Sequence, residues 1–434
     1  MTATALDTAL QDAVARYVAA NPQSKEHHVR AARVLPGGNT RSSIFSHPFP
    51  IVLTGGRGAR LTSLDGREYL DFLGEYTAGL YGHSNPVIAA AIHQALTDGW
   101  ALGGQSRLEE QLASLICGRF ESVERVRFTN SGTEANLMAL AAARAVSRRS
   151  RIVVFRGGYH GSLLAFGTKP SGVNAPYDCV VASYNDRSAT EQLLQANAAD
   201  IGAVLVEAMQ GSAGCIPGDK EFLHYLNTWC DTHGAVFILD EVMTSRLGPG
   251  GLQALYGLSP ALTTFGKYLG GGLTFGAFGG RAAIMDRFDP SRSDALLHAG
   301  TFNNNVLSLS AGIAGLTGVF TPQAATRLSA LGEHVRSELN GIARRAGVAM
   351  QFTGYGSMMN AHFCSGAIRS VEDLRSIDPR RSALFYLDLI EAGIWLAPRG
   401  MINLSLPMGN LEIECLVAAV SGFIQRRSHL LAAA

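Results

Sequence analysis

A lysine inside a glycine-rich string constrains this chain more than any other feature. Lys267 lies in TTFGKYLGGG (263–272), 27 positions after Asp240, which ends the apolar run AVFILD (235–240). Glycines on both sides let the backbone approach a ligand closely, so we interpret Lys267 as a site residue and not as a solvated surface charge. A carboxylate at the end of a buried strand needs a cation or a hydrogen-bond donor; alone, Asp240 would be interpreted as a helix cap or a structural ion pair.

Together, the two residues have the chemistry that pyridoxal 5′-phosphate (PLP) requires. This cofactor needs a lysine that forms an imine and an acid that holds the proton of the pyridinium nitrogen. Lys267 must be neutral to attack an aldehyde, and bringing a lysine pKa from about 10.4 to neutrality requires roughly 4 to 5 kcal/mol of differential stabilisation. Imine formation and an enclosed pocket supply it. We therefore predict a PLP site with Lys267 and Asp240 as its catalytic residues.

The composition indicates a globular protein whose partners are small molecules. Of 434 residues, 47% are hydrophobic and 16% are charged, enough for one large core and a smaller lobe. Lys and Arg number 36 against 35 Asp and Glu, so no broad field favours nucleic acid or an anionic membrane. With no signal-like N-terminus and no apolar run of about 20 residues, we expect a cytoplasmic location and no membrane contact. The six cysteines lack metal-ligand spacing, so no metal is expected.

Hydrophobic patterning divides the chain into an N-terminal segment of a small lobe (1–75), a large cofactor-binding domain (76–318) and a C-terminal small domain (319–434). In the large domain, helices alternate with apolar strands that lack period-two alternation, which is typical of a parallel sheet covered on both faces. The expected class is α/β, with a mainly parallel sheet and a smaller α+β lobe from both termini. Asp65-Gly66 indicates a hairpin turn. Helices are predicted over 6–20, 134–148, 221–233, 323–346 and 381–391, and strands over 51–54, 60–63, 126–129, 152–155, 203–206, 235–239, 349–353 and 358–363.

Two further motifs follow predicted strands. NSGTEAN (130–136) lies at a strand-to-helix junction, where free N–H groups and the helix dipole favour phosphate, although serine and threonine there are equally explained as helix caps. In GGYHG (157–161), Tyr159 is placed to stack on a flat ring; a core position is the alternative, and His160 is expected to lie behind it.

Seven motifs, in their order along the chain, resemble those of the class III PLP-dependent aminotransferases. They are NSGTEAN, GGYHG, VEAMQG, DEVMTSR, TTFGKYLGGG, FGAFGGR and HAGTFNNN. The resemblance spans nearly the whole chain and implies fold type I, a homodimer with shared active sites, and PLP bound to Lys267. VEAMQG carries Ala208 where many family members have proline. The same resemblance implies that Ser131, Gly132 and Thr133 hold the phosphate and that Thr301 reaches the phosphate in the neighbouring subunit. It also implies that Tyr159 and Val242 lie on opposite faces of the cofactor ring and that Asp240 pairs with the ring nitrogen. By the same resemblance, Glu207 and Gln210 lie near the O3′ side of the ring.

Within the family, GGGLTFGAFGGR (270–281) resembles the glutamate-1-semialdehyde aminomutase branch, but VEAMQG and FNNN depart from it. Other motifs look more like those of bacterial aminotransferases that act on aromatic β-amino acids such as β-phenylalanine. These motifs are PGGNTRS, EYTAGLYGHS, DEVMTSR, GTFNNN and a late PRG. That likeness implies that Arg41 and Arg399 bind substrate carboxylates, since a guanidinium matches a carboxylate in geometry. Each arginine alone is also explained as a surface residue. Candidates for an aromatic pocket are Tyr76, Phe45 and Phe302, with core packing as the alternative, and Arg246 has no assigned role.

The expected reaction is ping-pong transfer of the amino group of a 3-amino-3-arylpropanoate to a keto acid, 2-oxoglutarate or pyruvate. Three alternatives use the same residues or fold. They are an aminomutase that returns nitrogen to the same carbon skeleton, an ω-amine transaminase of broader range, and a PLP-binding protein without catalysis.

Overall fold

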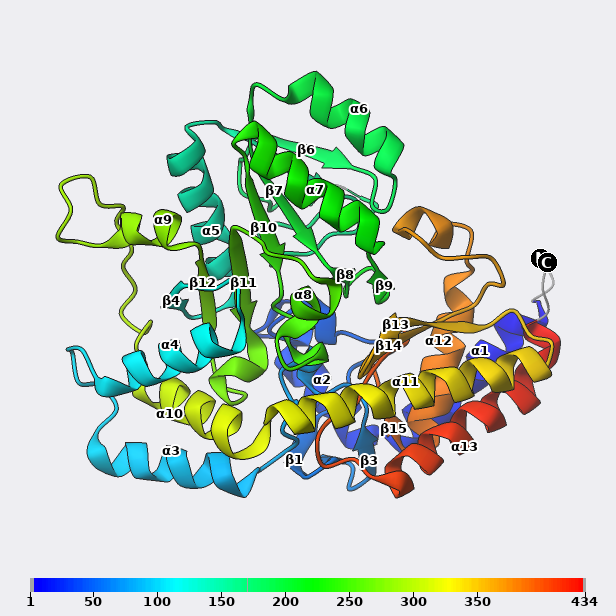
Figure 1. Cartoon of the computed structure of the whole chain (residues 1–434). Helices are drawn as coiled ribbons and strands as arrows, with labels where there is room; N and C mark the ends of the chain where they lie inside the picture. The colour runs from blue at the N-terminus through cyan, green and yellow to red at the C-terminus, as the bar shows by residue number, and fades with distance from the viewer. Residues whose placement is uncertain (1–3, 170, 432–434) are drawn as a thin grey trace.

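A seven-stranded sheet forms the middle layer of the larger lobe in the computed structural model, which describes residues 4–169 and 171–431 (Figure 1). Its strand order is β4-β12-β11-β10-β7-β5-β6, and its neighbouring strands are parallel except where β12 pairs with β11 and β4. The predicted α/β class with a mainly parallel sheet is confirmed. The strands are β4 (Arg125–Thr129), β5 (Arg151–Phe155), β6 (Cys179–Ala182), β7 (Ile201–Glu207), β10 (Val236–Asp240), β11 (Leu262–Gly266) and β12 (Gly276–Gly280).

Helices cover both faces of this sheet. Successive residues of a strand point to opposite sides of the sheet, so each strand packs against both layers of helices. Ile238 belongs to the buried cluster that includes residues of α5 (Gly132–Ser147). Its neighbour Phe237 belongs to a second cluster that includes residues of α7 (Lys220–His233). Burial on both faces explains why these strands are apolar throughout.

Segments from both ends of the chain form the smaller lobe. β3 (Glu68–Asp71) pairs in parallel with β15 (Ile394–Trp395) and antiparallel with β2 (Arg60–Ser63), and the predicted Asp65-Gly66 turn joins β2 to β3. Helices pack around the two small sheets, β1-β2-β3-β15 and β13-β14-β16 (Figure 1). The remaining elements of this lobe are α1 (Ala5–Ala20), β1 (Leu53–Arg57), α11 (Pro322–Arg345), β13 (Gln351–Tyr355), β14 (Met358–His362), α12 (Pro379–Glu391), β16 (Met401–Asn403) and α13 (Asn410–Arg427).

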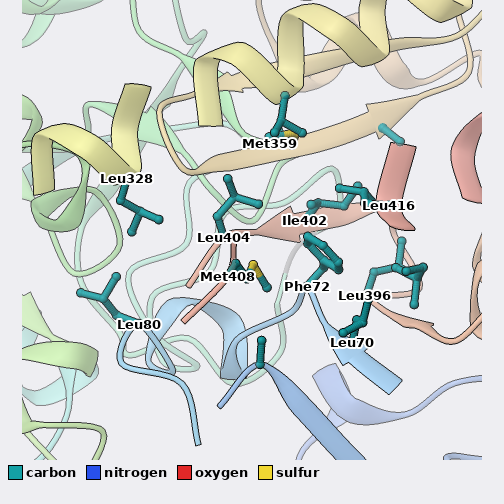
Figure 2. Close-up of a cluster of buried hydrophobic side chains, with 14 of the residues drawn as sticks. Leu70, Phe72, Leu80, Leu328, Met359, Leu396, Ile402, Leu404, Met408 and Leu416 are labelled. Atoms are coloured by element: carbon teal, nitrogen blue, oxygen red, sulfur yellow. The ribbon is translucent and has the colours of Figure 1, made fainter. Parts of the chain in front are cut away.

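Figure 2 shows buried side chains that join the N-terminal and C-terminal parts of this lobe. Leu70 and Phe72 lie in one hydrophobic cluster with Leu396, Ile402 and Leu404. Apolar contact of this kind is the main stabilising term in a core. It therefore holds the segment after β3, which carries Tyr76, against the strand β16 and the segment before it, which carries Arg399, and both of these residues line the cavity described below.

The predicted helices are confirmed to within two residues at each end. Two predicted strands, 51–54 and 349–353, begin two residues too early, because Ile51 and Ala349 are buried but precede the residues that pair as β1 and β13. Within the described residues, no helix combines the length and apolarity needed to cross a membrane. The other elements are α2 (Pro22–Ala31), α3 (Pro86–Asp98), α4 (Arg107–Arg119), α6 (Arg187–Asn197), β8 (Met209–Gln210), β9 (Ile216–Pro217), α8 (Gly251–Tyr256), α9 (Ala282–Met285) and α10 (Val306–Ala314).

Candidate active site

A cavity of about 890 Å³ opens at the carboxyl ends of the parallel strands, where open α/β sheets bind ligands. Residues at or just after the ends of β4, β5, β7, β10 and β11 line it, together with residues from the N-terminal and C-terminal segments. Residues far apart in the sequence therefore meet in one place. The predicted site residues that line the cavity are Arg41, Tyr76, Ser131, Gly132, Thr133, Tyr159, Glu207, Asp240, Val242, Lys267 and Arg399.

Asp240 is buried at the end of β10, and three donors hold its carboxylate. Oδ2 accepts hydrogen bonds from Asn136 Nδ2 (2.9 Å) and His160 Nδ1 (2.8 Å), and Oδ1 accepts one from the Val242 backbone nitrogen (3.0 Å). Asn136 is itself oriented by Thr264 Oγ1, which donates to its Oδ1 (2.8 Å). Such charge-assisted bonds stabilise the ionised carboxylate, so it is prepared to hold a protonated ring nitrogen.

Sequence reasoning undervalued the two side chains that hold Asp240. His160 is 2% exposed and Asn136 is 1% exposed, and both are predicted motif residues without an assigned site role. The spacing in NSGTEAN carried a usable signal, because Asn136 lies one helical turn beyond Gly132 and Thr133, on the same side of the helix. The pairing of His160 with Asp240 joins residues 80 positions apart, and local patterns do not show it.

The N-terminus of α5 faces the cavity with Ser131, Gly132 and Thr133. Ser131 Oγ caps the helix by accepting a hydrogen bond from the Glu134 backbone nitrogen (3.2 Å). Free N–H groups in the first turn and the helix dipole favour an anion at this position. A Cβ atom on Gly132 would lie 2.8 Å from Val242 Cγ2, so the close approach of these two residues requires glycine.

Lys267 begins the turn after β11 and has a φ of 57°, a left-handed conformation that is uncommon for a residue with a side chain. Its Nζ donates a hydrogen bond to the Tyr76 carbonyl oxygen (2.6 Å). Burial lowers the pKa of Lys267 to about 8, against the opposing effect of the Asp240 carboxylate. A larger fraction of this lysine than of an ordinary lysine is therefore in the neutral form that nucleophilic attack requires.

Glu207 fixes the loop that carries Tyr159. Its carboxylate accepts hydrogen bonds from the backbone nitrogens of Tyr159 (3.0 Å) and Gly211 (3.1 Å), and burial raises its pKa to about 7. The Tyr159 side chain is 45% exposed at the cavity, which is not a core environment. Gln210 is buried outside the cavity lining and donates from Nε2 to the Arg156 carbonyl oxygen (3.0 Å).

Two arginines flank the ring of Tyr76. The Arg41 Cζ lies 5.8 Å and the Arg399 Cζ 5.1 Å from the ring centroid. Arg41 also forms an ion pair with Glu75, while Nε of Arg399 is buried and has no hydrogen-bond acceptor among the described residues. Arg41 and Arg399 thus bring two guanidinium groups to the lining of the cavity.

Besides Gln210, three predicted residues do not line the cavity of this chain: Thr301, Phe302 and Phe45. Phe302 is 65% exposed. The segment that carries Thr301 and Phe302 still reaches the cavity rim, because Asn303 Oδ1 accepts a hydrogen bond from Asn130 Nδ2 (3.1 Å). The expected role of Thr301 concerns a neighbouring subunit and stays a prediction.

The family is shown by comparison with known proteins. The model of the aminotransferase class-III family matches residues 42–410. The chain belongs to the class III aminotransferases. It is 50% identical over 431 residues to the β-phenylalanine transaminase of Variovorax paradoxus, covering 99% of both chains, and 36% identical over 417 residues to the glutamate-1-semialdehyde 2,1-aminomutase of Methylacidiphilum infernorum, covering 91% of this chain and 96% of that one.

Solved structures agree with this assignment. The crystal structure of the Variovorax paradoxus β-phenylalanine aminotransferase has a TM-score of 0.98 at 50% identity, covering 99% of this chain and 100% of that one. An ω-transaminase from Sphaerobacter thermophilus has a TM-score of 0.87 at 36% identity, covering 93% of this chain and 97% of that one. The predicted fold type I is therefore confirmed.

Class III aminotransferases use PLP, and the residues of this cavity fit that cofactor. The buried Asp240 carboxylate offers an acceptor for a pyridinium N–H group, and the N-terminus of α5 offers donors to a phosphate. Lys267 lines the same cavity, and burial lowers its pKa to about 8. This class III aminotransferase thus has in its own chain a lysine, a ring-nitrogen acid and an anion site that suit PLP.

Proposed function

We propose that this aminotransferase takes the amino group from an aromatic β-amino acid such as β-phenylalanine. The observation that carries the proposal is the pair of guanidinium groups, Arg41 and Arg399, on the ring of Tyr76 beside Lys267. A guanidinium binds a carboxylate through two parallel hydrogen bonds, and an aromatic ring packs against a second aromatic ring. The likeness to the β-phenylalanine transaminase supports the same donor class.

The site residues would divide the reaction as follows. PLP, when bound, supplies an electrophilic aldehyde carbon and a ring that withdraws electrons from the reacting carbon. Asp240 would hold the proton of the ring nitrogen and keep the ring electron-poor. The Nζ of Lys267 would take the proton from the substrate carbon and deliver it to the C4′ atom of the cofactor, a task that suits a lysine whose pKa burial lowers to about 8. Ser131, Gly132 and Thr133 would hold the phosphate, with Tyr159 and Val242 on the two faces of the ring.

The second half of the ping-pong reaction would use a keto acid as amino acceptor, 2-oxoglutarate or pyruvate. Two arginines at one site suit the two carboxylates of 2-oxoglutarate, since each guanidinium can bind one. With pyruvate only one of them would be used. Loss of the arginine that pyruvate does not use should therefore weaken the binding of 2-oxoglutarate more than the binding of pyruvate.

The test compares two amino donors that share the aromatic ring and the amine. β-Phenylalanine has a carboxylate, and 1-phenylethylamine lacks it. Arg41→Ala is expected to lower kcat/KM for β-phenylalanine by about tenfold to hundredfold, because a hydrogen bond to a charged group contributes about 1.5–3 kcal/mol. Activity with 1-phenylethylamine should stay within about twofold. Arg281→Ala removes an exposed arginine that pairs with Asp231 and serves as the control.

Glutamate formed from β-phenylalanine and 2-oxoglutarate by the wild type is the supporting result. If no glutamate forms while glutamate 1-semialdehyde is converted, the enzyme is an aminomutase. If 1-phenylethylamine is used as well as β-phenylalanine, and Arg41→Ala affects both equally, it is a broader ω-amine transaminase. A bound cofactor whose absorption near 400 nm does not change with any amine would indicate a binding protein without catalysis.

We further propose a homodimer with shared active sites. Large apolar side chains are exposed on the segment that reaches the cavity rim and on nearby loops, with Leu297 92%, Phe302 65% and Trp100 55% exposed. Exposed apolar side chains of this size mark a protein interface when they form a patch. Sedimentation should give twice the chain mass. Mixing Lys267→Ala with Thr301→Ala chains should produce hybrid dimers in which one of the two sites has both residues, and recovery of activity would support Thr301 acting across the interface.

A further inference from the structure

The residues before the cavity-lining Ala78 form a left-handed turn that is unusual for their type. Gly74, Glu75, Tyr76 and Thr77 have φ angles of 55°, 47°, 52° and 83°. A non-glycine residue in this region carries a strain of about 1–3 kcal/mol and persists only when its surroundings hold it. Three such residues in succession lie next to the reacting groups, so something in the fold must hold this turn.

The turn positions several parts of the site at once. The Tyr76 carbonyl oxygen accepts the hydrogen bond from Lys267 Nζ (2.6 Å), and the guanidinium groups of Arg41 and Arg399 lie near the Tyr76 ring. In a right-handed turn the carbonyl of Tyr76 would point elsewhere, because ψ sets the direction of the peptide group. The left-handed conformation therefore sets the acceptor that orients the lysine nitrogen.

The start of the turn is held by local hydrogen bonds. Asp71 Oδ1 accepts from the backbone nitrogens of Leu73 and Gly74, both at 2.9 Å, and the Gly79 nitrogen donates to the Gly74 carbonyl oxygen (2.8 Å). The end of the turn has a different partner. Arg246 Nη1 donates to the Thr77 carbonyl oxygen (3.2 Å), and Nη2 donates to the carbonyl oxygen of Leu404.

Arg246 thus joins three parts of the chain that are distant in sequence. It lies in the 3₁₀ segment Thr244–Leu247 after β10, which also carries Asp240 at its end. Leu404, which follows β16, is anchored by its side chain in the buried cluster with Leu80 (Figure 2). One end of the arginine bridge is therefore a rigid core residue, and the other is the strained turn.

Burying the guanidinium group of Arg246 in the core lowers the stability of this protein. It is 1% exposed, forms no ion pair with a carboxylate in the described part of the chain, and its Nε is buried without a hydrogen-bond acceptor there. Burial lowers its pKa to about 10. An apolar residue of similar volume at such a position is often neutral or favourable for stability. Residues that break a local rule of stability are expected at functional sites.

We propose that Arg246 is a positioning residue: by bridging the Thr77 and Leu404 carbonyl groups, it holds the turn Gly74–Thr77 in its left-handed conformation and so places the Tyr76 carbonyl against Lys267. The proposal depends on the lysine chemistry of the family and not on the identity of the amino donor. Arg246 does not line the cavity; besides its hydrogen bonds to the turn and to Leu404, its charge is a minor cause of the lowered pKa of Lys267, so exchange of the turn is measured together with kcat.

The experiment uses the PLP-loaded enzyme and the donor that the wild type accepts best. Arg246→Met removes both hydrogen bonds and the charge, and Arg246→Lys retains the charge but has no planar fork to reach both carbonyl groups. Arg119→Met is the matched control, because Arg119 also has buried N–H groups without acceptors and donates to a carbonyl oxygen, that of Phe320, away from the turn. Three quantities are measured: the melting temperature, kcat and KM, and hydrogen exchange of peptides that cover residues 73–79.

In Arg246→Met we expect exchange in 73–79 to become at least tenfold faster and kcat to fall at least tenfold, with a melting temperature within a few degrees of wild type. A shift of about 1 Å in a positioned group lowers rates by up to about a hundredfold. Arg246→Lys should lie between Arg246→Met and wild type, and Arg119→Met should match wild type in kcat and in exchange of 73–79.

Unchanged kcat and unchanged exchange of 73–79 in Arg246→Met would overturn the proposal. So would a fall in kcat that Arg119→Met reproduces, since that would reflect general loss of core packing. If Arg246→Met does not fold, Arg246→Lys decides: wild-type kcat with wild-type exchange of 73–79 contradicts the positioning role, and a lower kcat with local opening supports it.

Discussion

Replacing Asp240 by asparagine should separate the charge of this residue from its shape. The carboxylate accepts three hydrogen bonds, from Asn136 Nδ2, His160 Nδ1 and the Val242 backbone nitrogen, and is 4% exposed. An amide of the same size keeps only one acceptor atom. Whichever way it turns, its NH₂ group meets at least one of these buried donors.

The expected size of the effect follows from these contacts. A buried donor that loses its acceptor costs about 1–3 kcal/mol, so Asp240→Asn should lower the free energy of unfolding by about that amount. Removing one partner of a buried charge pair costs about 3–5 kcal/mol. If the carboxylate holds the ring-nitrogen proton during the reaction, kcat should fall by about 10²–10⁴-fold.

The assay is a single half-reaction with saturating donor, followed through the absorption of the cofactor, with urea unfolding measured in parallel. Asp231→Asn, an exposed aspartate paired with Arg281, is the control and should be unchanged in both. A decrease in kcat of less than tenfold in a folded, PLP-loaded Asp240→Asn enzyme would refute the assigned role of the carboxylate.

Three further predictions concern the same site. In the cofactor-free protein, labelling of Lys267 by an amine reagent should reach half its maximal rate near pH 8, because burial lowers the pKa of the lysine to about 8; a midpoint near the ordinary 10.5 would contradict this. Burial raises the folded-state pKa of Glu207 to about 7, so the folded protein binds an extra proton between about pH 4.5 and 7. This group should therefore make the free energy of unfolding fall as pH rises through that window, and Glu207→Gln should remove that fall. An unchanged pH slope in the variant would show that Glu207 does not titrate there. Asn136→Leu leaves Thr264 Oγ1 and Asp240 Oδ2 each without one hydrogen-bond partner. The variant should therefore be less stable by about 1–3 kcal/mol and have a lower kcat. An unchanged unfolding free energy in calorimetry would mean that these bonds add nothing to stability.

Local sequence patterns predicted the parts of the fold that depend on burial and on turn chemistry. Apolar runs predicted β4, β5, β7 and β10 and placed Asp240 at a strand end, because a polar residue stops such a run. The strands β6, β11 and β12 were not predicted, and Lys267 was singled out by its glycines and not as the end of a strand. The direction of β12 was not predicted, although residues 267–275 are shorter than the dozen or so residues that a parallel crossover requires. The division at residues 75/76 and 318/319, the subunit arrangement and the cytoplasmic location stay predictions.

The rest of the site depends on contacts between segments that are distant in the sequence, and local sequence patterns do not predict such contacts. Glutamate, tyrosine and threonine disfavour positive φ, so nothing in the string GEYT indicates the left-handed turn at 74–77. Arginine is mostly exposed in proteins, and Arg246 is instead buried because the Thr77 and Leu404 carbonyl groups meet it there. The two arginines at Tyr76 come from opposite ends of the chain.

The most direct test of the central claim is to reduce the PLP-loaded enzyme with borohydride and map the modified peptide by mass spectrometry. One pyridoxyl group per chain on Lys267 is the predicted result, and Lys267→Arg should leave the chain unlabelled. A label on another lysine, or none in an enzyme that still transfers amino groups, would contradict the assignment of this site.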